Sequence, residues 1–409
     1  MQPTPSDATT SPRMAVVVAC VALFTDMLVY GILIPVLPLL PAMAEAGPSA
    51  TGLLFAAYAA ALVMVTPIAG RVVDKRGSRG PLLAALVGLA CACLLFTIGG
   101  PYWLLLTART LQGAAAGLSW VAGLSLIAAT VPLQRRATYL GLAMSMVSVG
   151  ALAGPPLAGW LAGLGGHSAP FLLAAALLMI DGALRLAFVR PTSPPSDDPP
   201  TALDVLRTPG CWPVVALILI GAAVTSCIEP VLPMQLAREF GVGSAGIGML
   251  FALLTLVAAC LNPLVGACLP RVSLRALTLV GAASAAAGLL LVGVGPNLPV
   301  ITAGLVCLGS AIALLVAPAS ALIGVQGAMA TPPAIGGAYS LNNLAYAGGL
   351  VLGPALSGPL TEHLGFTHAC LTLAGFLALT VPTFIRLPRK YAAATAESIQ
   401  IRDRRGQHP

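Results

Sequence analysis

Long apolar stretches alternate with short polar segments along nearly the whole chain. A helix needs about 20 apolar residues to cross a bilayer core, and twelve stretches reach that length. Runs this long predict helices rather than the roughly ten-residue alternating strands of a membrane barrel. The pattern therefore predicts an all-α integral membrane protein with transmembrane helices near residues 14–40, 50–71, 81–100, 102–129, 137–163, 169–189, 211–236, 244–269, 273–295, 299–326, 335–361 and 366–387.

Composition excludes a soluble protein. Of the 409 residues, 58% are apolar and 8% are charged, and the mean hydropathy is +0.95. A soluble domain carries about 25% charged residues, so this chain could not cover its surface with polar groups. The net charge of +7 does not indicate nucleic-acid binding, because the basic residues are not clustered on one soluble face.

The basic residues predict the orientation. They gather in every second loop and in the last segment, whereas the other loops offer only Arg238. Loops rich in Lys and Arg stay in the cytoplasm, so both termini are expected there. Together with abundant Ala, Gly and Arg, this predicts a multi-pass protein of a bacterial inner (plasma) membrane. The basic loop residues are Arg71, Lys75, Arg76, Arg79, Arg135, Arg136, Arg190, Arg207, Arg271 and Arg275.

The chain divides into two halves around a Pro-rich linker. We expect a disordered cytoplasmic tail at 1–13, a six-helix half at 14–190, a linker at 191–210, a second six-helix half at 211–387 and a basic cytoplasmic tail at 388–409. The halves repeat one another, since Pro35 and Pro38 recur as Pro230 and Pro233. A second repeat matches Gly150, Gly154, Pro155 and Gly159 with Gly349, Gly353, Pro354 and Gly358. Two such halves with a substrate site between them are typical of rocker-type transporters.

The loop after the second span resembles the first motif of the major facilitator superfamily. It carries Gly70, Asp74, Lys75, Gly77 and Arg79 at the motif's spacing. The resemblance implies the major facilitator fold of two pseudo-symmetric halves. It also implies that Asp74 caps the positive N-terminal end of span 11 and holds the outward-facing state. The alternative is a simple positive-inside anchor.

Two further motifs resemble that superfamily, and the one in span 5 resembles the antiporter motif of its drug/proton subfamily. Span 4 carries Arg109 followed by Gln112 and Gly113. Span 5 carries the antiporter pattern of small residues, with Ala158 in place of one glycine. Small residues let helices pack closely in lipid, and we expect these positions to act in conformational gating. They are Gly150, Gly154, Pro155 and Gly159, in a pattern that begins at Gly141.

Five ionisable residues fall inside apolar spans, namely Asp26, Arg109, Asp181, Arg185 and Glu229. An intramembrane charge costs at least about 2.5–3.5 kcal/mol unless it is paired or hydrated, so each requires a reason. Asp26 and Glu229 have no basic residue one helical turn away, and a proton and a cationic amine can compete for such carboxyls. The alternative is a buried acid that serves helix packing.

The other three residues have more mixed interpretations. Asp181 and Arg185 stand four residues apart, which suits a structural pair as well as a proton or substrate site. For Arg109, the resemblance implies a role in proton relay or in the cavity.

Within the superfamily, the stretches around Asp26, Asp181 and Glu229 resemble the vesicular amine transporters and their bacterial relatives. The resemblance implies that Asp26 and Glu229 handle the substrate ammonium, the proton, or both. The chain departs from that pattern at Tyr58, where the relatives carry a lysine, and at Asn343, where they carry an acid. Four polar or aromatic residues are candidates to line the cavity with the acids: Tyr58, Asn262, Asn343 and Tyr346.

These observations predict a proton-coupled antiporter that exports organic cations, either amines or cationic drugs as in multidrug efflux, by alternating access. Its partners would be the small cation, the proton and the lipid bilayer, acting as a monomer without nucleic acid. No metal and no cofactor is expected, with the proton gradient as the energy source. The alternative is an exporter or importer of another small metabolite. An enzyme is not expected, because the four histidines carry no metal or nucleophile motif.

Overall fold

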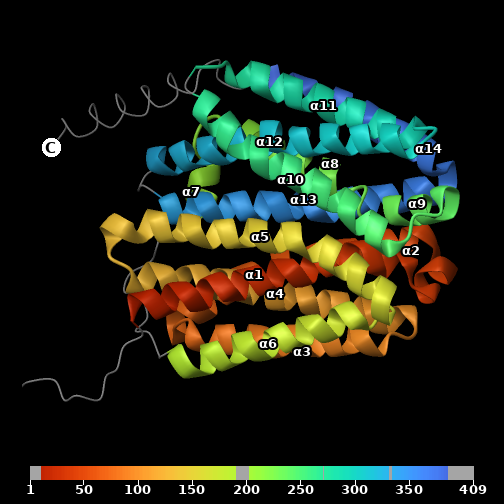
Figure 1. Cartoon of the computed structure of the whole chain (residues 1–409). Helices are drawn as coiled ribbons and strands as arrows, with labels where there is room; N and C mark the ends of the chain where they lie inside the picture. Colours follow the sequence, from red (N-terminus) through yellow and green to blue (C-terminus); the bar gives the residue numbers. More distant parts are fainter. Residues whose placement is uncertain (1–10, 190–201, 270, 331–333, 386–409) are drawn as a thin grey trace, which may run out of the picture. The chain divides into compact units, whose positions relative to one another are not determined.

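The computed structural model describes residues 11–189, 202–269, 271–330 and 334–385, and within them every regular element is helical (Figure 1). The elements are α1 (Pro12–Val36), the 3-10 turn η1 (Leu37–Leu39), α2 (Pro41–Arg76), α3 (Arg79–Ile98), α4 (Tyr102–Thr130), α5 (Leu133–Gly165), α6 (Ala169–Phe188), α7 (Ala202–Leu206), α8 (Cys211–Ser226), α9 (Leu232–Phe240), α10 (Ser244–Cys268), α11 (Leu274–Val294), α12 (Leu298–Met329), α13 (Ile335–Leu364) and α14 (Phe366–Ile385).

The predicted transmembrane pattern is confirmed. Nine of the described helices are long and apolar enough to cross a membrane, and α8 and α14 provide shorter apolar segments. With α13, these helices coincide with the twelve predicted stretches. The first half of the linker and most of both predicted tails lie outside the described residues. Within the linker, the short α7 forms around Val205, which is fully buried.

The seventh span is not one helix. It was predicted at 211–236, but α8 ends at Ser226 and α9 begins at Leu232, with Glu229 and Pro230 in the turn between them. A proline has no N–H and collides with the preceding helical turn, so Pro230 interrupts the ladder of hydrogen bonds. The two sides are joined instead by a hydrogen bond from the Leu232 N–H to the Ile228 carbonyl, of 2.9 Å.

The second helix is longer than predicted and bent. It was expected at 50–71 but runs from Pro41 to Arg76 and changes direction at Gly47, whose φ of 85° lies in the left-handed region that favours glycine. Pro41 suits a first helical position because its missing N–H would have no partner there. The stretch 47–56 after the bend belongs to a different packing unit from the two ends of α2.

The first unit comprises the described residues of 11–46, 57–189 and 236–252. In it α1 lies between α5 and α4, and α3 packs against α4 and α6 (Figure 1). Glycines allow the closest approach of α5 to α1: a Cβ on Gly150 would lie 2.5 Å from the carbonyl oxygen of Phe24. A Cβ on Gly154 would lie 2.8 Å from the carbonyl oxygen of Leu28.

The second unit comprises the described residues of 47–56, 202–235 and 253–385. Its helices α11 and α12 pack together, as do α13 and α8. Residues 47–56 of α2 join this unit by packing on α13, where the Ser49 N–H donates to Glu362 Oε2 over 3.0 Å. Because the units are defined by packing and not by sequence, the predicted domain boundaries at 14–190 and 211–387 stay a prediction.

Candidate functional site

Asp26 lies in the middle of α1 and is 1% exposed. Its Oδ2 accepts a hydrogen bond of 2.9 Å from the indole Nε1–H of Trp120 on α4. Its Oδ1 is also buried and makes no hydrogen bond within the described part of the chain. The carboxyl group therefore presents one engaged oxygen and one that is available for a proton or a cation.

Arg109 lies among aromatic rings and is fully buried. Its guanidinium carbon stands 5.0 Å from the ring centroid of Tyr30 and 4.6 Å from that of Tyr58. The two rings are themselves 5.0 Å apart, and Gln112 Oε1 accepts a hydrogen bond of 2.8 Å from Nη1. Ring faces attract cations at such distances, so the tyrosines stabilise a charge that lipid would penalise.

Asp181 and Arg185 form the pair that their spacing indicated. Both are buried on α6, and the two carboxylate oxygens of Asp181 accept hydrogen bonds from Nε and Nη2 of Arg185. Arg185 Nη1 also donates to the backbone carbonyl of Leu82 on α3. This bidentate geometry favours the structural interpretation of the pair.

Glu229 lies half-buried in the break between α8 and α9. Tyr346 of α13 is close enough for the carboxylate to act on its phenol electrostatically. Asn343, also half-buried, lies one turn earlier on the same helix. The second unit thus gathers an acid and an aromatic hydroxyl at a broken helix, where backbone carbonyls are released from the helical ladder.

The remaining candidates are more dispersed. Asn262 is exposed on α10. At the end of α2, Gly77 has a φ of 74° and its N–H caps the Val73 carbonyl, which explains locally why the motif needs glycine there. Asp74 and Lys75 are exposed on the last turn of α2, whereas Arg79 opens α3. A Cβ at Gly70 would meet nothing within 4 Å, so close packing does not require this glycine.

The predicted small residues of span 5 differ in what they contact. Gly150 and Gly154 pack on α1, and Pro155 Cδ approaches Gly31. Gly159 touches the backbone of Ser244, whose Oγ donates to the Gly159 carbonyl over 3.2 Å. Gly141, in contrast, would meet nothing within 4 Å if it carried a Cβ.

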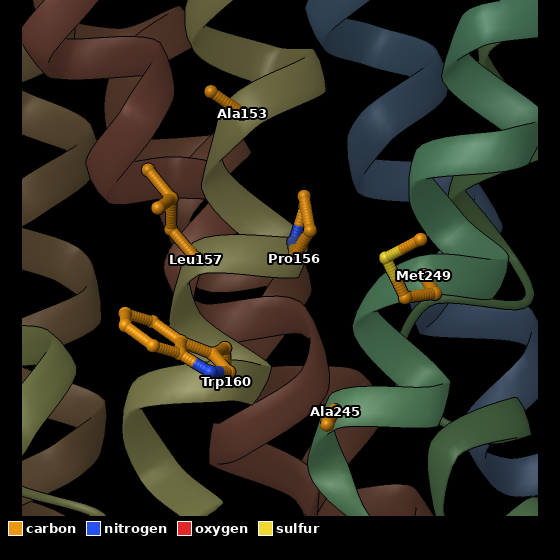
Figure 2. A pocket seen from close by; sticks show the side chains of 6 residues that line it. All are labelled: Ala153, Pro156, Leu157, Trp160, Ala245 and Met249. Atoms are coloured by element: carbon orange, nitrogen blue, oxygen red, sulfur yellow. The ribbon is translucent and has the colours of Figure 1, made fainter. Parts of the chain in front are cut away.

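An apolar groove of about 460 Å³ lies in the first unit beside the prolines of α5 (Figure 2). The side chains of Leu157 and Trp160 on α5 line it opposite Met249 on the first turns of α10. No predicted site residue lines this groove, and its lining carries no charge.

Trp120 and Tyr30 were not predicted from the sequence to contact the buried charges. Tyr30 stands one turn after Asp26 on α1, and this i, i+4 spacing could have indicated it. Trp120 is a large aromatic residue within a stretch of small ones on span 4, but its partner lies 94 positions away in sequence. Such a contact depends on tertiary packing, and no local pattern predicts it.

Comparison with known proteins gives the family. The family model described as Major Facilitator Superfamily matches residues 19–228 and 214–406. The chromaffin granule amine transporters of Rattus norvegicus and Homo sapiens are each 26% identical over 318 residues, which are 77% of this chain and 61% of theirs. The vesicular acetylcholine transporter of Drosophila melanogaster is 24% identical over 423 residues, covering 93% of this chain and 72% of that protein. This chain thus spans 61% of the length of the two amine transporters.

The fold agrees with this match. A bacterial homologue of the human lysosomal transporter Spinster superposes with a TM-score of 0.75 at 14% identity, over 95% of this chain and 98% of that one. The human organic anion transporter MFSD10 superposes with a TM-score of 0.65 at 20% identity, over 91% of this chain and 99% of that one. A family match across both halves, together with an all-helical fold that these solved structures share, shows that the chain belongs to the major facilitator superfamily.

Proposed function

We propose that this chain is a proton-coupled antiporter that exports organic cations, amines or cationic drugs, by alternating access. The observation that carries the proposal is the Asp26 carboxyl, buried on a membrane-spanning helix with Oδ1 available. A carboxyl in such a place can hold a proton or pair with an ammonium group, but it cannot hold both with the same oxygen. That exclusion is what exchange of a cation for a proton requires.

Glu229 supports the proposal from the second unit. Its position in a proline break places a carboxylate beside backbone acceptors and the phenol of Tyr346. Acceptor-rich surroundings with an aromatic neighbour suit an ammonium group. The relatives named as amine and acetylcholine transporters act on substrates of this chemical class.

The orientation is part of the proposal. Positive loops favour cytoplasmic termini, so substrate would leave the cell while protons enter through a plasma membrane, the inner one in a bacterium. The competing function is transport of another small metabolite on the same fold. An anion carrier would require an accessible interior cation, whereas Arg109 is enclosed by Tyr30 and Tyr58.

The test is transport by purified protein in proteoliposomes that carry a pH gradient. A panel of monoamines, polyamines and quaternary ammonium drugs is offered, and proton release is recorded with a pH-sensitive dye. We expect substrate-dependent proton movement that Asp26→Asn abolishes, although this variant inserts normally. Asp204→Asn on the short helix α7 is the matched control, since it makes the same chemical change outside the spans. Full exchange by Asp26→Asn would overturn the proposal.

A further inference from the structure

We propose that Trp120 is the positioning residue of Asp26: its indole N–H holds Oδ2, so that the proton and the substrate ammonium must use the same oxygen, Oδ1. The inference rests on the proposed function and deepens it. Its geometric basis is the hydrogen bond of 2.9 Å from Nε1 to Oδ2, together with the buried Oδ1 that has no partner within the described residues.

The chemistry of indole makes this assignment specific. An indole N–H only donates and cannot accept a hydrogen bond in return. When Asp26 takes up a proton, Oδ1 is the favoured oxygen, because a proton on Oδ2 would weaken the hydrogen bond that this atom accepts from the indole. The proton therefore resides preferentially on Oδ1, and an incoming ammonium group meets there either a free oxygen or a protonated one. Competition is thus confined to a single atom.

Packing holds the indole in place. Trp120 is half-buried against an apolar cluster shared by α1, α4 and α5. Leu23 of α1 and Ile127 of α4 belong to this cluster, together with Ala143 of α5. Because these contacts fix the ring, the direction of its N–H is set before Asp26 is charged. A side chain fixed in this way is a preorganised donor.

The charged groups around Asp26 come from two other helices. The Asp181–Arg185 pair of α6 acts on it electrostatically, and Arg109 lies on the same helix as Trp120. The charges of α5 are confined to its first turn, at Arg135 and Arg136. Asp181 and Arg185 neutralise one another, so the indole is the group that touches the carboxylate directly.

The first experiment compares the pH dependence of exchange in Trp120→Phe and the parent protein. A hydrogen bond donated to a carboxylate favours its charged form, so its loss lets Asp26 keep its proton at higher pH. We expect the midpoint of the profile to move up by about one pH unit. Trp103→Phe is the matched control, because Trp103 lies on the same helix but is 73% exposed. A purely structural role would lower the amount of folded protein and leave the midpoint unchanged, which would overturn the inference.

A second measurement needs neither transport nor a folded Trp120→Phe variant. The chain has four tryptophans, so protein labelled with ¹⁵N-tryptophan gives a simple indole N–H spectrum. We expect one resonance to move with pH and to stop moving in Asp26→Asn, which keeps an acceptor oxygen but cannot ionise. No titrating resonance, or the same titration in Asp26→Asn, would overturn the inference. Export that survives Asp26→Asn would instead contradict the proposed function, and the titration would still decide the role of Trp120.

Discussion

At the residue scale, Asp26 and Glu229 differ in how their carboxyl groups are accommodated inside the membrane. Asp26 is buried in an intact helix and receives one hydrogen bond from a fixed indole. Glu229 lies at a break, where the backbone supplies additional polar groups. A charge inside a membrane persists only with such local support. This difference predicts different responses to substitution.

Glu229→Gln should weaken permanently cationic ligands more than uncharged analogues. Glutamine keeps the shape and hydrogen-bonding capacity but removes the charge, so the loss should be about 1–3 kcal/mol, the scale of a charge-assisted hydrogen bond. The measurement is a binding series on purified protein with a quaternary ammonium ligand and its uncharged analogue. Equal losses for the two ligands would mean that Glu229 holds the helices together instead.

The Asp181–Arg185 pair should lose more stability on single than on double substitution. Arg185→Met alone leaves a buried carboxylate without its partner and should cost about 3–5 kcal/mol of stability. Asp181→Leu combined with Arg185→Met removes both charges and should cost clearly less. Thermal unfolding in detergent measures both variants. If the double variant is stable but inactive in exchange, Asp181 has a transport role beyond the pair.

At the element scale, glycines determine how closely the helices approach. Gly150 and Gly154 bring α5 onto the backbone of α1, whereas Gly141 and Gly163 on the same helix face open space. Tight contact of small residues replaces the hydrophobic driving force that lipid removes. Some glycines of the span therefore serve packing, and others do not.

Gly150→Ala should destabilise the protein by about 1–3 kcal/mol, because its new Cβ would meet the Phe24 carbonyl oxygen at 2.5 Å. Gly163→Ala on the same helix should be neutral or stabilising by up to about 1 kcal/mol, since alanine favours helix and meets no neighbour. Melting temperatures of the two variants in one detergent provide the comparison. A Gly150→Ala protein as stable as the parent would contradict this account of the α1–α5 contact.

Helix positions were largely predictable from the sequence, because crossing a bilayer imposes a length and an apolar composition that few other segments share. The break at Glu229 falls inside the span predicted at 211–236, and Pro230 and Pro233 account for it because prolines interrupt a helix. The bend at Gly47 was not expected, since a lone glycine in an apolar helix has several possible roles. The partners of Asp26 and Arg109 could not be predicted, because they come from other helices and depend on how side chains interlock.

At the scale of the whole molecule, packing does not follow the order of the sequence. Residues 47–56 of α2 belong to the second unit with the end of α13, and the start of α10 belongs to the first unit with the end of α5. In the predicted topology, all four segments lie on the extracytoplasmic side, whereas Asp74 lies at the cytoplasmic end of α2. A transporter that alternates between two states must release the extracytoplasmic contacts when it forms the cytoplasmic contact implied for Asp74, and the reverse.

Two substitutions on α2 should therefore shift the equilibrium between the inward-facing and outward-facing states in opposite directions. Gly52→Ala adds a Cβ that would meet the Pro354 carbonyl oxygen at 2.4 Å, so it weakens the extracytoplasmic packing and favours the outward-facing state. Asp74→Ala removes the latch implied by the first motif and favours the inward-facing state. Gly375→Ala on α14, where a Cβ meets nothing within 4 Å, is the control.

The measurement is the reactivity of single introduced cysteines toward a membrane-impermeant reagent applied from either side of the membrane. A change of about 1.4 kcal/mol in the balance of the two states alters their ratio tenfold, which such labelling resolves. We expect Gly52→Ala to raise extracytoplasmic labelling and Asp74→Ala to lower it, with Gly375→Ala unchanged. Labelling that moves in the same direction in both variants would show general loosening of α2, and the two ends of this helix would then have no opposed roles in switching.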